Sequence, residues 1–376
     1  MSPPPGAGER PPVAVLFGGP SLEHDISILS GTAIGDALAD AGVPVMPVLI
    51  DLAGRWWWLP DGHRRAGRPA AVYDRPEDLG ATGPHSAGAA LDRLAAARPA
   101  PIVFIALHGP FGEDGTVQAM LEAAGIGYTG SGVLASALGM DKAMQKRLWR
   151  GLGLPVVDWR EVTADRWRAD PDGVLGELEA FAGAAEPRLM VKPAHLGSSV
   201  GITLAHDVTE RRPALDLAQR HDALAVVERY LVGARDLEVA VIGNGPPLGV
   251  HGPGEVVPGH EFYDFAAKYT PGLSRTTIRA AVPEATRELV RKHARDAYRA
   301  VGAAGFARVD FLLQGASVVI SEINTVPGFT PISLFPTMPA EAGLDFTAVC
   351  LRILDLATER WAGRATTSLE IGDLPR

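Results

Sequence analysis

The sequence predicts a chain of two structural classes, an N-terminal parallel α/β unit followed by an α+β part. Two observations predict this division. In the first 130 residues, buried-strand runs alternate with helical patterns, which indicates a parallel sheet covered by helices. Beyond residue 130, strands, hairpins and helices follow one another without that alternation. The 376 residues are enough for two or three domains, each with its own hydrophobic core.

The N-terminal unit begins with VAVLFGG at 13–19, an apolar run that predicts a buried strand. We expect a helix over about 26–41 and a second strand over 43–51. PIVFIALHG at 101–109 predicts a further buried strand, and a helix is expected over 116–124. Parallel pairing of these strands would place their C-terminal loops at one edge of the sheet, where ligands collect in open α/β folds.

The segment 60–100 is rich in Ala, Gly, Pro and Arg with weak periodicity, so we expect loops and short surface helix there. The preceding run RWWWLP, 55–60, could form a binding platform, but packing of its Trp side chains under a loop is the better expectation. Residues 1–12 lack an apolar signal region and are expected to form a disordered tail, and residues 365–376 are expected to form a C-terminal tail.

The second part begins with one long helical pattern, from Val133 to about residue 153. Strand and hairpin patterns follow over 188–206, 223–243 and 255–272, and a last helix is expected at about 283–302. The single cysteine, Cys350, lies in an amphipathic helical pattern and is expected to pack there as a small apolar residue.

Composition excludes several classes of protein. A net charge of −9 and a pI of about 5.6 argue against a nucleic-acid or anionic-membrane surface. No uninterrupted apolar run approaches the about 18 residues of a membrane span. One cysteine excludes an intrachain disulfide and a cysteine-based zinc site, as expected in the reducing cytoplasm.

The stretch 306–324 predicts a β-hairpin that carries polar residues on one face. With a three-residue loop at Gly315–Ser317, Asp310 lies opposite Glu322 and Arg308 opposite Asn324. A loop of two or four residues would break this parity. Oxygen ligands beside an arginine suit Mg²⁺ shared with phosphates, but a structural salt-bridge network is the alternative, and these residues alone leave the choice open.

A glycine-rich loop, residues 197–201, follows a strand that ends near Lys192. Small residues let backbone N–H groups approach phosphate oxygens, and the lysine adds a positive charge. The pattern is not a Walker loop, and an ordinary Gly-Ser hairpin turn is the alternative. The strand that ends in VERYL offers Glu228 and the backbone beyond it to a nucleobase, although strand composition alone could explain it.

The order of these motifs is more specific than any one of them. It runs GGPSLEHDIS, HGPFGEDG, YTGSG with MDK, VKPAHLGSSVGI, VERYL, EFYDFAAKY, RVDFLL and SEINTVPGFT. This series closely resembles the D-alanine–D-alanine ligase family of the ATP-grasp superfamily. The resemblance implies a three-domain ATP-grasp architecture, with an N-terminal α/β substrate domain at 13–130 and ATP-grasp subdomains at 131–227 and 228–364.

The resemblance also implies an ATP site with two Mg²⁺ ions, for which Mn²⁺ can substitute. The residues expected to bind ATP are Lys142, Lys192, Ser198, Ser199, Glu228, Tyr230, Leu231, Asp236, Lys268 and Leu312. Those expected to bind metal are Asp310, Glu322 and Asn324. Asp236 stands where the family usually has a glutamate that binds ribose. With Glu238 nearby, this leaves the ribose contact open.

The catalytic residues that the resemblance implies are Glu23, Ser198, Tyr269, Arg308 and Gly328. Glu23 would hold the ammonium of a first D-amino acid, and Ser198 would link Glu23 to Tyr269 in a lid. Arg308 and the N–H of Gly328 would meet the developing oxyanion. Substrate would also contact His108, Ser333 and Leu334, the last two at the second carboxylate, and Glu113 would line the site.

The expected reaction joins two D-alanines through an acylphosphate, for peptidoglycan precursors. The resemblance implies that Tyr269 favours D-alanine over D-lactate as acceptor. Thr337 stands where many relatives have a basic residue, which leaves selection of the second carboxylate open. Alternatives are another acceptor (D-lactate, D-serine or an amino acid of specialised metabolism) and a non-catalytic ATP-binding protein. A hydride-transferring enzyme is disfavoured because GxGxxG is missing. We expect a cytoplasmic homodimer with small-molecule substrates; the residues themselves do not fix the oligomeric state.

Overall fold

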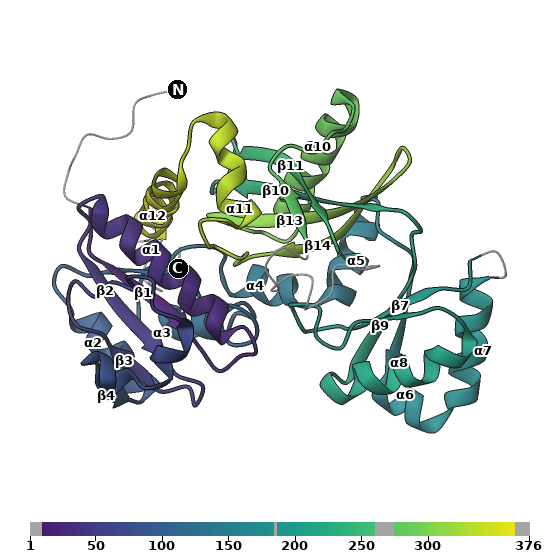
Figure 1. Cartoon of the computed structure of the whole chain (residues 1–376), viewed down its shortest axis with the longest axis horizontal. Helices are drawn as coiled ribbons and strands as arrows, with labels where there is room; N and C mark the ends of the chain where they lie inside the picture. Colours follow the sequence, from purple (N-terminus) through teal and green to yellow (C-terminus); the bar gives the residue numbers. More distant parts are fainter. Residues whose placement is uncertain (1–9, 184–185, 260–273, 365–376) are drawn as a thin grey trace, which may run out of the picture.

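The computed structural model describes residues 10–183, 186–259 and 274–364, and within these ranges the chain forms three units, each built on its own sheet (Figure 1). The N-terminal unit is purple to blue in Figure 1, the central unit teal, and the C-terminal unit green to yellow. The predicted lid residues Lys268 and Tyr269 and most of both predicted tails lie outside the described residues. No described helix is long and apolar enough to cross a membrane.

The N-terminal sheet has the strand order β4-β3-β2-β1-β5, and β1 pairs in parallel with both β2 and β5. Its strands are β1 (Val13–Gly18), β2 (Val45–Ile50), β3 (Trp56–Trp58), β4 (Thr82–His85) and β5 (Ile102–Ile105). The predicted parallel layer is therefore confirmed, with two antiparallel strands added at one edge. The tryptophans are buried as expected, but in strand β3 rather than under a loop, and they alternate between the two faces of the sheet.

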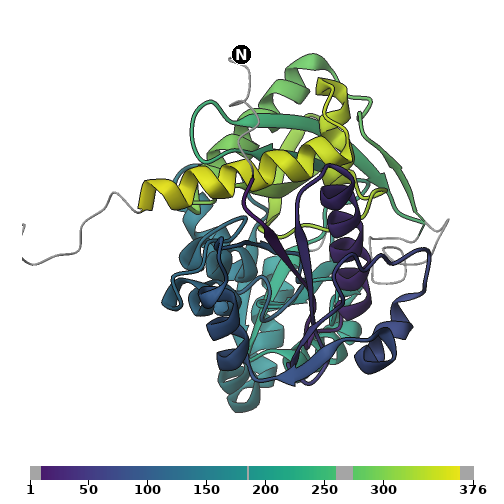
Figure 2. The same cartoon turned by 90° about the vertical axis from the view of Figure 1, so that its left-hand side faces the viewer.

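Helices cover both faces of this sheet. They are α1 (His24–Asp40) and α12 (Phe346–Arg364) on one face, and α2 (Ala87–Ala96) and α3 (Thr116–Ala123) on the other. Figure 2 shows α12 in yellow lying beside α1, so the last described helix packs on the first unit of the chain. Cys350 is buried in α12, as predicted. The segment 60–100 contains short helices, as expected, namely η1 (Ala70–Asp74), η2 (Pro76–Leu79) and α2, but it also forms strand β4, which was not predicted.

The central unit is a four-stranded antiparallel sheet of order β6-β9-β7-β8. Its strands are β6 (Trp159–Thr163), β7 (Leu189–Pro193), β8 (Thr203–Ala205) and β9 (Leu224–Arg229). Its helices are α6 (Ala164–Ala169), α7 (Pro171–Ala182) and α8 (Val208–His221), and they share one hydrophobic core with one face of the sheet. The other face carries Met190 and Glu228, which pair directly across β7 and β9.

The C-terminal unit has five antiparallel strands in the order β12-β11-β10-β13-β14. They are β10 (Arg235–Ile242), β11 (Gly249–Val257), β12 (Arg275–Thr277), β13 (Phe306–Gln314) and β14 (Ser317–Asn324). Helix α10 (Glu284–Ala300) covers one face, while α11 (Leu334–Thr337) and the 3₁₀ helix η3 (Met338–Ala342) contact β10 and β11.

The single helix predicted from Val133 onward is wrong, because it forms two helices, α4 (Val133–Met140) and α5 (Lys142–Gly151). Asp141 adopts an extended backbone and its side chain accepts the N–H of Met144 at 2.9 Å, so it ends one helix and caps the next. Both helices contact β14, and Trp149 of α5 lies in the core of the C-terminal unit. The residue pair 227/228, where the sequence placed a subdomain boundary, falls inside β9.

The predicted hairpin register is confirmed: Arg308 pairs with Asn324 and Asp310 with Glu322. The predicted three-residue loop is wrong, because Gln314 pairs with Ser317 and leaves only two loop residues. A β-bulge directly after Asp310, with the extra residue on β14, restores the parity that the shorter loop would have broken. Gly315 begins the loop with a φ of 61°, a left-handed conformation that favours glycine.

Candidate active site

A cavity of about 1130 Å³, counted with its open mouth, lies between the central and C-terminal sheets. It is large enough for a small molecule or a cofactor. Many residues singled out from the sequence line it: Lys142, Lys192, Ser198, Ser199, Glu228, Tyr230, Leu231, Asp236, Arg308, Asp310, Leu312 and Glu322. Apolar side chains complete the lining, among them Met190, Ile202 and Phe311. Such a lining can hold a flat base on one side and charged groups on the other.

A basic cluster surrounds Glu228 on the central wall. Lys146 Nζ lies 2.7 Å from one oxygen of the buried carboxylate, and Lys192 Nζ donates to the other at 2.8 Å. Burial alone would raise the pKa of Glu228, but the charges of Lys146 and Lys192 outweigh it and lower that pKa to about 2. Burial alone would likewise lower the pKa of Lys192, and Glu228 raises it above its ordinary value. The cluster therefore carries one surplus positive charge.

Sequence reasoning did not identify Lys146. The signal was present, because Lys146 follows Lys142 by four residues and so lies on the same face of α5. Its side chain is fully buried, and burial, with the charge of Lys192, lowers its pKa. Lys146 is thus an internal counter-charge to Glu228, not an exposed ligand.

The glycine-rich loop has an unusual backbone. Ser198 and Ser199 have φ values of 50° and 57°, and Gly201 has 69°. Successive residues with positive φ turn backbone N–H groups toward one side, which suits an anion. Ser198 Oγ donates a hydrogen bond to Glu23 of the N-terminal unit. This contact brings the predicted pair together across 175 residues of chain.

An acidic cluster forms the opposite wall. Arg308 donates two hydrogen bonds of 2.7 Å to Asp310, and its Nε lies 3.4 Å from Glu238. The amide of Asn324 donates to Asp310 at 2.9 Å, which leaves its carbonyl oxygen for another partner. Burial alone would lower the pKa of Arg308, but Asp310 and Glu238 raise it well above its ordinary value. One guanidinium thus meets three carboxylates, counting Glu322.

The predicted metal site combines carboxylate and amide oxygens. No described group of three His, Cys, Asp or Glu side chains could hold a metal ion by itself. The predicted ligands instead comprise two carboxylates and one amide, brought onto one hairpin by the register of β13 and β14. Hard oxygen donors with surplus negative charge fit Mg²⁺ if phosphate oxygens and water complete its coordination. The predicted ligands therefore fit a bound Mg²⁺ ion.

Glu23 lies between two glycines of different loops. A Cβ at Gly109 would lie 2.9 Å from Glu23 Oε2, and one at Gly197 would lie 3.3 Å from it. A side chain at Gly109 would displace the carboxylate. The loop 107–118 thus forms the near side of the Glu23 site.

His108 and Glu113 are buried behind Glu23, where the sequence placed them at the site. His108 Nδ1 lies 3.0 Å from the carbonyl oxygen of Val326 and 3.5 Å from Glu113 Oε1. Burial opposes the charged form of His108, but Glu113 raises its pKa; burial raises the pKa of Glu113 as well. His108 therefore joins the N-terminal unit to the loop after β14.

That loop carries the remaining predicted residues. A Cβ at Gly328 would lie 3.6 Å from Ser333 Oγ, and Ser333 stands at the N-terminus of α11, one residue before Leu334. Thr337 turns its hydroxyl back to the carbonyl of Ser333 at 2.8 Å. Gly328, Ser333 and Leu334 do not line the cavity as the described residues define it. Their loop is joined to His108 through the carbonyl of Val326.

The comparisons with known proteins decide the family. The family described as D-ala D-ala ligase N-terminus matches residues 12–131, and that described as D-ala D-ala ligase C-terminus matches residues 148–355. The chain belongs to the D-alanine–D-alanine ligase family.

Relatives in this family are similar over nearly their whole length. The chain is 41% identical to the D-alanine–D-alanine ligase of Chlorobium chlorochromatii, a match covering 93% of this chain and 98% of the relative. It is also 41% identical to the D-alanine–D-alanine ligase of Kineococcus radiotolerans, over 94% of this chain and 98% of that one.

Solved structures of D-alanine ligases share the fold. The D-alanine–D-alanine ligase of Coxiella burnetii matches with a TM-score of 0.76 and 30% identity, covering 95% of this chain and 97% of that one. The VanG D-Ala:D-Ser ligase of Enterococcus faecalis matches with a TM-score of 0.79 and 29% identity, over 93% and 99%. The predicted family and ATP-grasp fold are confirmed.

Proposed function

We propose that this chain is an ATP-dependent D-alanine–D-alanine ligase that supplies D-alanyl-D-alanine for peptidoglycan precursors. Family membership and near-complete coverage of relatives bearing that name support the activity. The contact of Ser198 with Glu23 is the structural observation that carries the proposal. It sets a carboxylate that can hold an ammonium group beside a loop that can hold phosphates.

ATP occupies the cavity between the two walls. Lys142, Lys192 and the backbone of Ser198 and Ser199 bind its phosphates, while Glu228, Tyr230, Leu231 and Leu312 surround the base. Ionised Glu228 accepts the exocyclic amine of adenine. Asp236 and Glu238 both line the cavity and are the two candidates for the ribose contact. Lys268 contributes from the segment outside the described residues.

Asp310, Glu322 and Asn324 would hold two Mg²⁺ ions, which Mn²⁺ can replace. Bound there, the ions neutralise the negative charge that phosphate oxygens bring to an already acidic wall. The chain's own part is to keep these oxygens on one face, and the pairing of β13 with β14 does this.

The reaction transfers the γ-phosphoryl group of ATP to the carboxylate of a first D-alanine, held through its ammonium by Glu23. The amine of a second D-alanine then loses a proton and attacks the acylphosphate, so that a C–N bond forms and a C–O bond to phosphate breaks. Arg308 and the N–H of Gly328 stabilise the oxyanion. Ser333 and the N–H of Leu334 hold the second carboxylate, with His108 behind them. Water must be excluded from the site, because it would otherwise hydrolyse the acylphosphate.

The test is phosphate release with a panel of D-amino and D-hydroxy acids, with products identified by mass spectrometry. With equal D-alanine and D-lactate at about pH 7, we expect mainly dipeptide, because the family resemblance implies that Tyr269 favours the amine acceptor. Mostly depsipeptide would overturn the assignment. D-serine belongs in the panel because one structural relative is named a D-Ala:D-Ser ligase.

We also infer that the protein works as a homodimer in the cytoplasm, where ATP is available. Its family membership motivates the dimer. Light scattering of the purified chain at working concentration tests it, and a monomeric mass would overturn it.

A further inference from the structure

His195 stands at the base of the glycine-rich loop, two residues after β7 ends. Its backbone N–H donates to Asp222 Oδ2 at 2.7 Å, and its ring Nδ1 lies 2.9 Å from the same oxygen. Asp222 stands between α8 and β9, and its Oδ1 accepts the N–H of Leu224 at 3.0 Å. One carboxylate therefore fixes His195 to the central sheet.

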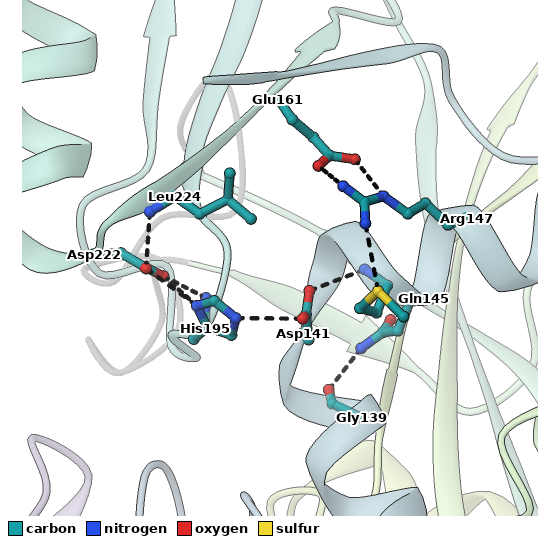
Figure 3. A network of polar contacts seen from close by, with 9 residues as sticks. Gly139, Asp141, Gln145, Arg147, Glu161, His195, Asp222 and Leu224 are labelled. Atoms are coloured by element: carbon teal, nitrogen blue, oxygen red, sulfur yellow. Dashed lines mark hydrogen bonds and ion pairs between the residues drawn. The ribbon is translucent and has the colours of Figure 1, made fainter. Parts of the chain in front are cut away.

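The opposite edge of the ring faces helix α5. His195 Nε2 lies 3.3 Å from Oδ2 of Asp141, whose Oδ1 caps α5 at the N–H of Met144. Figure 3 shows the imidazole between the two carboxylates, Asp222 on one side and Asp141 on the other. The ring thus bridges the central sheet and the first turn of α5.

The neighbours of His195 hold the next residue of that turn. The backbone N–H of Lys142 donates to the carbonyl of Ala194 at 3.0 Å, and its ammonium donates to the carbonyl of Leu196. The same ammonium lies 3.6 Å from Glu322 on the acidic wall. Contacts with Ala194 and Leu196, the two sequence neighbours of His195, therefore hold Lys142 between the two walls.

Helix α5 itself joins the two ATP-binding units. Ala143, in its first turn, packs with Ala194 and Val226 of the central unit. Trp149, two turns later, lies in the core of the C-terminal unit. A change in how the first turn meets residues 194–196 would therefore alter the spacing of the glycine-rich loop and the acidic wall.

The geometry selects the charged form of His195. A neutral imidazole has one N–H, so one ring nitrogen would turn a lone pair toward a carboxylate. The charged groups that act on the ring are Asp222, from the α8–β9 junction, and Asp141, from the α4–α5 junction. The hydrogen bond with Asp222 raises the pKa of His195 most, burial lowers it, and the charges of both carboxylates add to the rise. Lys142 directs its ammonium away, to Leu196 and Glu322.

We propose that the imidazolium of His195 is a positioning residue that holds the glycine-rich loop against the first turn of α5, so that Lys142 and the loop meet the ATP phosphates together. This inference rests on the proposed function, which places ATP in the cavity. His195 does not line the described cavity, so it acts through Lys142 and the loop. Its contribution is present while the ring is protonated and is lost as pH rises through its raised pKa.

The test measures the Kd of a non-hydrolysable ATP analogue with Mg²⁺ from about pH 6 to about pH 9. For the wild type, we expect binding to weaken about two- to fivefold as pH rises, the size of a half-exposed charged contact. His195→Asn, which can bond Asp222 but carries no charge, should bind weakly at every pH. His195→Arg, which carries a permanent charge, should bind tightly at every pH. In His195→Asn, kcat at saturating ATP should change less than Kd.

Two further measurements separate positioning from structural support. Asp141→Asn keeps a side chain that can cap α5 but removes one charge from the ring, so the weakening of binding should move to lower pH. The ring proton of His195, assigned by its loss in His195→Asn, should titrate by NMR above the ordinary histidine range. If His195→Asn does not fold, the loss of the resonance in His195→Arg assigns it instead, and Asp141→Asn and the titration still decide the question.

Each outcome has a distinct meaning. Wild-type Kd and pH dependence in both His195→Asn and Asp141→Asn, with turnover intact, would overturn the positioning role and leave the proposed function standing. An ordinary or lowered pKa for the ring would overturn it as well. A wild-type protein that binds no ATP analogue and forms no ADP would overturn the proposed function and this inference with it.

Discussion

The two charged walls of the cavity are built in different ways. On the acidic wall, Glu238, Asp310 and Glu322 face Arg308, and all four lie on the adjacent strands β10, β13 and β14. On the basic wall, Lys146, Lys192 and Glu228 come from α5, β7 and β9. The first cluster is set by hydrogen-bonded strand pairing, whereas the second requires a helix to be placed correctly on a sheet. The acidic wall is thus preformed, and the basic wall is assembled.

This difference gives the walls different roles. A preformed cluster with surplus negative charge can hold cations in a fixed position, as electrostatic catalysis requires. An assembled cluster with surplus positive charge can rearrange when phosphates arrive, because Lys192 can leave Glu228 while Lys146 still neutralises it. Changes on the acidic wall should therefore affect turnover, and changes on the basic wall should affect assembly and ATP binding.

The largest effect is expected for Glu322→Gln on the acidic wall. The amide keeps the shape but not the charge, and lost electrostatic stabilisation of this kind costs about 3 kcal/mol or more, at least a hundredfold in kcat. Melting temperature should stay near that of the wild type, since Glu322 is partly exposed. Steady-state kinetics at saturating Mg²⁺ measures the effect, and exposed Glu341→Gln is the matched control. A near-normal kcat would refute the metal assignment.

The acidic wall was also the part of the site that local sequence could predict. Arg308, Asp310, Glu322 and Asn324 fall within one hairpin, so alternation along two strands placed them together. The loop length was predicted incorrectly and the register correctly, because the bulge after Asp310 compensates for the shorter loop. The local sequence pattern does not predict a bulge of this kind, since the position of the bulge depends on how the whole sheet twists.

The basic wall could not be predicted in the same way. Lys146 and Glu228 are far apart in the chain, and their contact depends on α5 beginning at Lys142. The sequence suggested one helix through Asp141, because helical periodicity continues across that residue and a cap is a local exception to it. The strands and helices of the N-terminal unit could be predicted because apolar runs of that length are compatible with few other structures. The packing of α12 on that unit could not be predicted, since no local sequence pattern identifies a packing partner so distant in the chain.

A smaller effect is expected from titration of Glu228, which tests whether the basic wall is held together by charge. Its pKa of about 2 lies below the ordinary 4.5. The shift contributes about 3 kcal/mol to the free energy of unfolding above pH 4.5, and this is lost as pH falls toward about 2. Urea unfolding of the wild type and Glu228→Gln should therefore differ at neutral pH and converge in acid. Unfolding energies that fall in parallel would show that Glu228 is not stabilised by the two lysines.

The smallest of these effects is expected for Lys192→Ala, which separates the binding role of the basic wall from the catalytic role of the acidic one. Lys192 should contact phosphate in both the ground state and the transition state, so its loss should raise the KM for ATP about tenfold and lower kcat less than Glu322→Gln does. Removing Lys192 leaves Lys146 as the partner of Glu228, so the cluster loses its surplus positive charge but keeps a neutralised carboxylate, and the fold should survive.

Cys350→Ala is the matched control for this variant, because it truncates a buried side chain that packs in α12, far along the chain from both walls. It should lower the melting temperature slightly and change neither kinetic constant. ATP dependence measured for the three proteins side by side decides the question. An unchanged KM in Lys192→Ala would remove phosphate binding from the basic wall. A kcat loss as large as that of Glu322→Gln would remove the distinction between the walls, since both would then act mainly in the transition state.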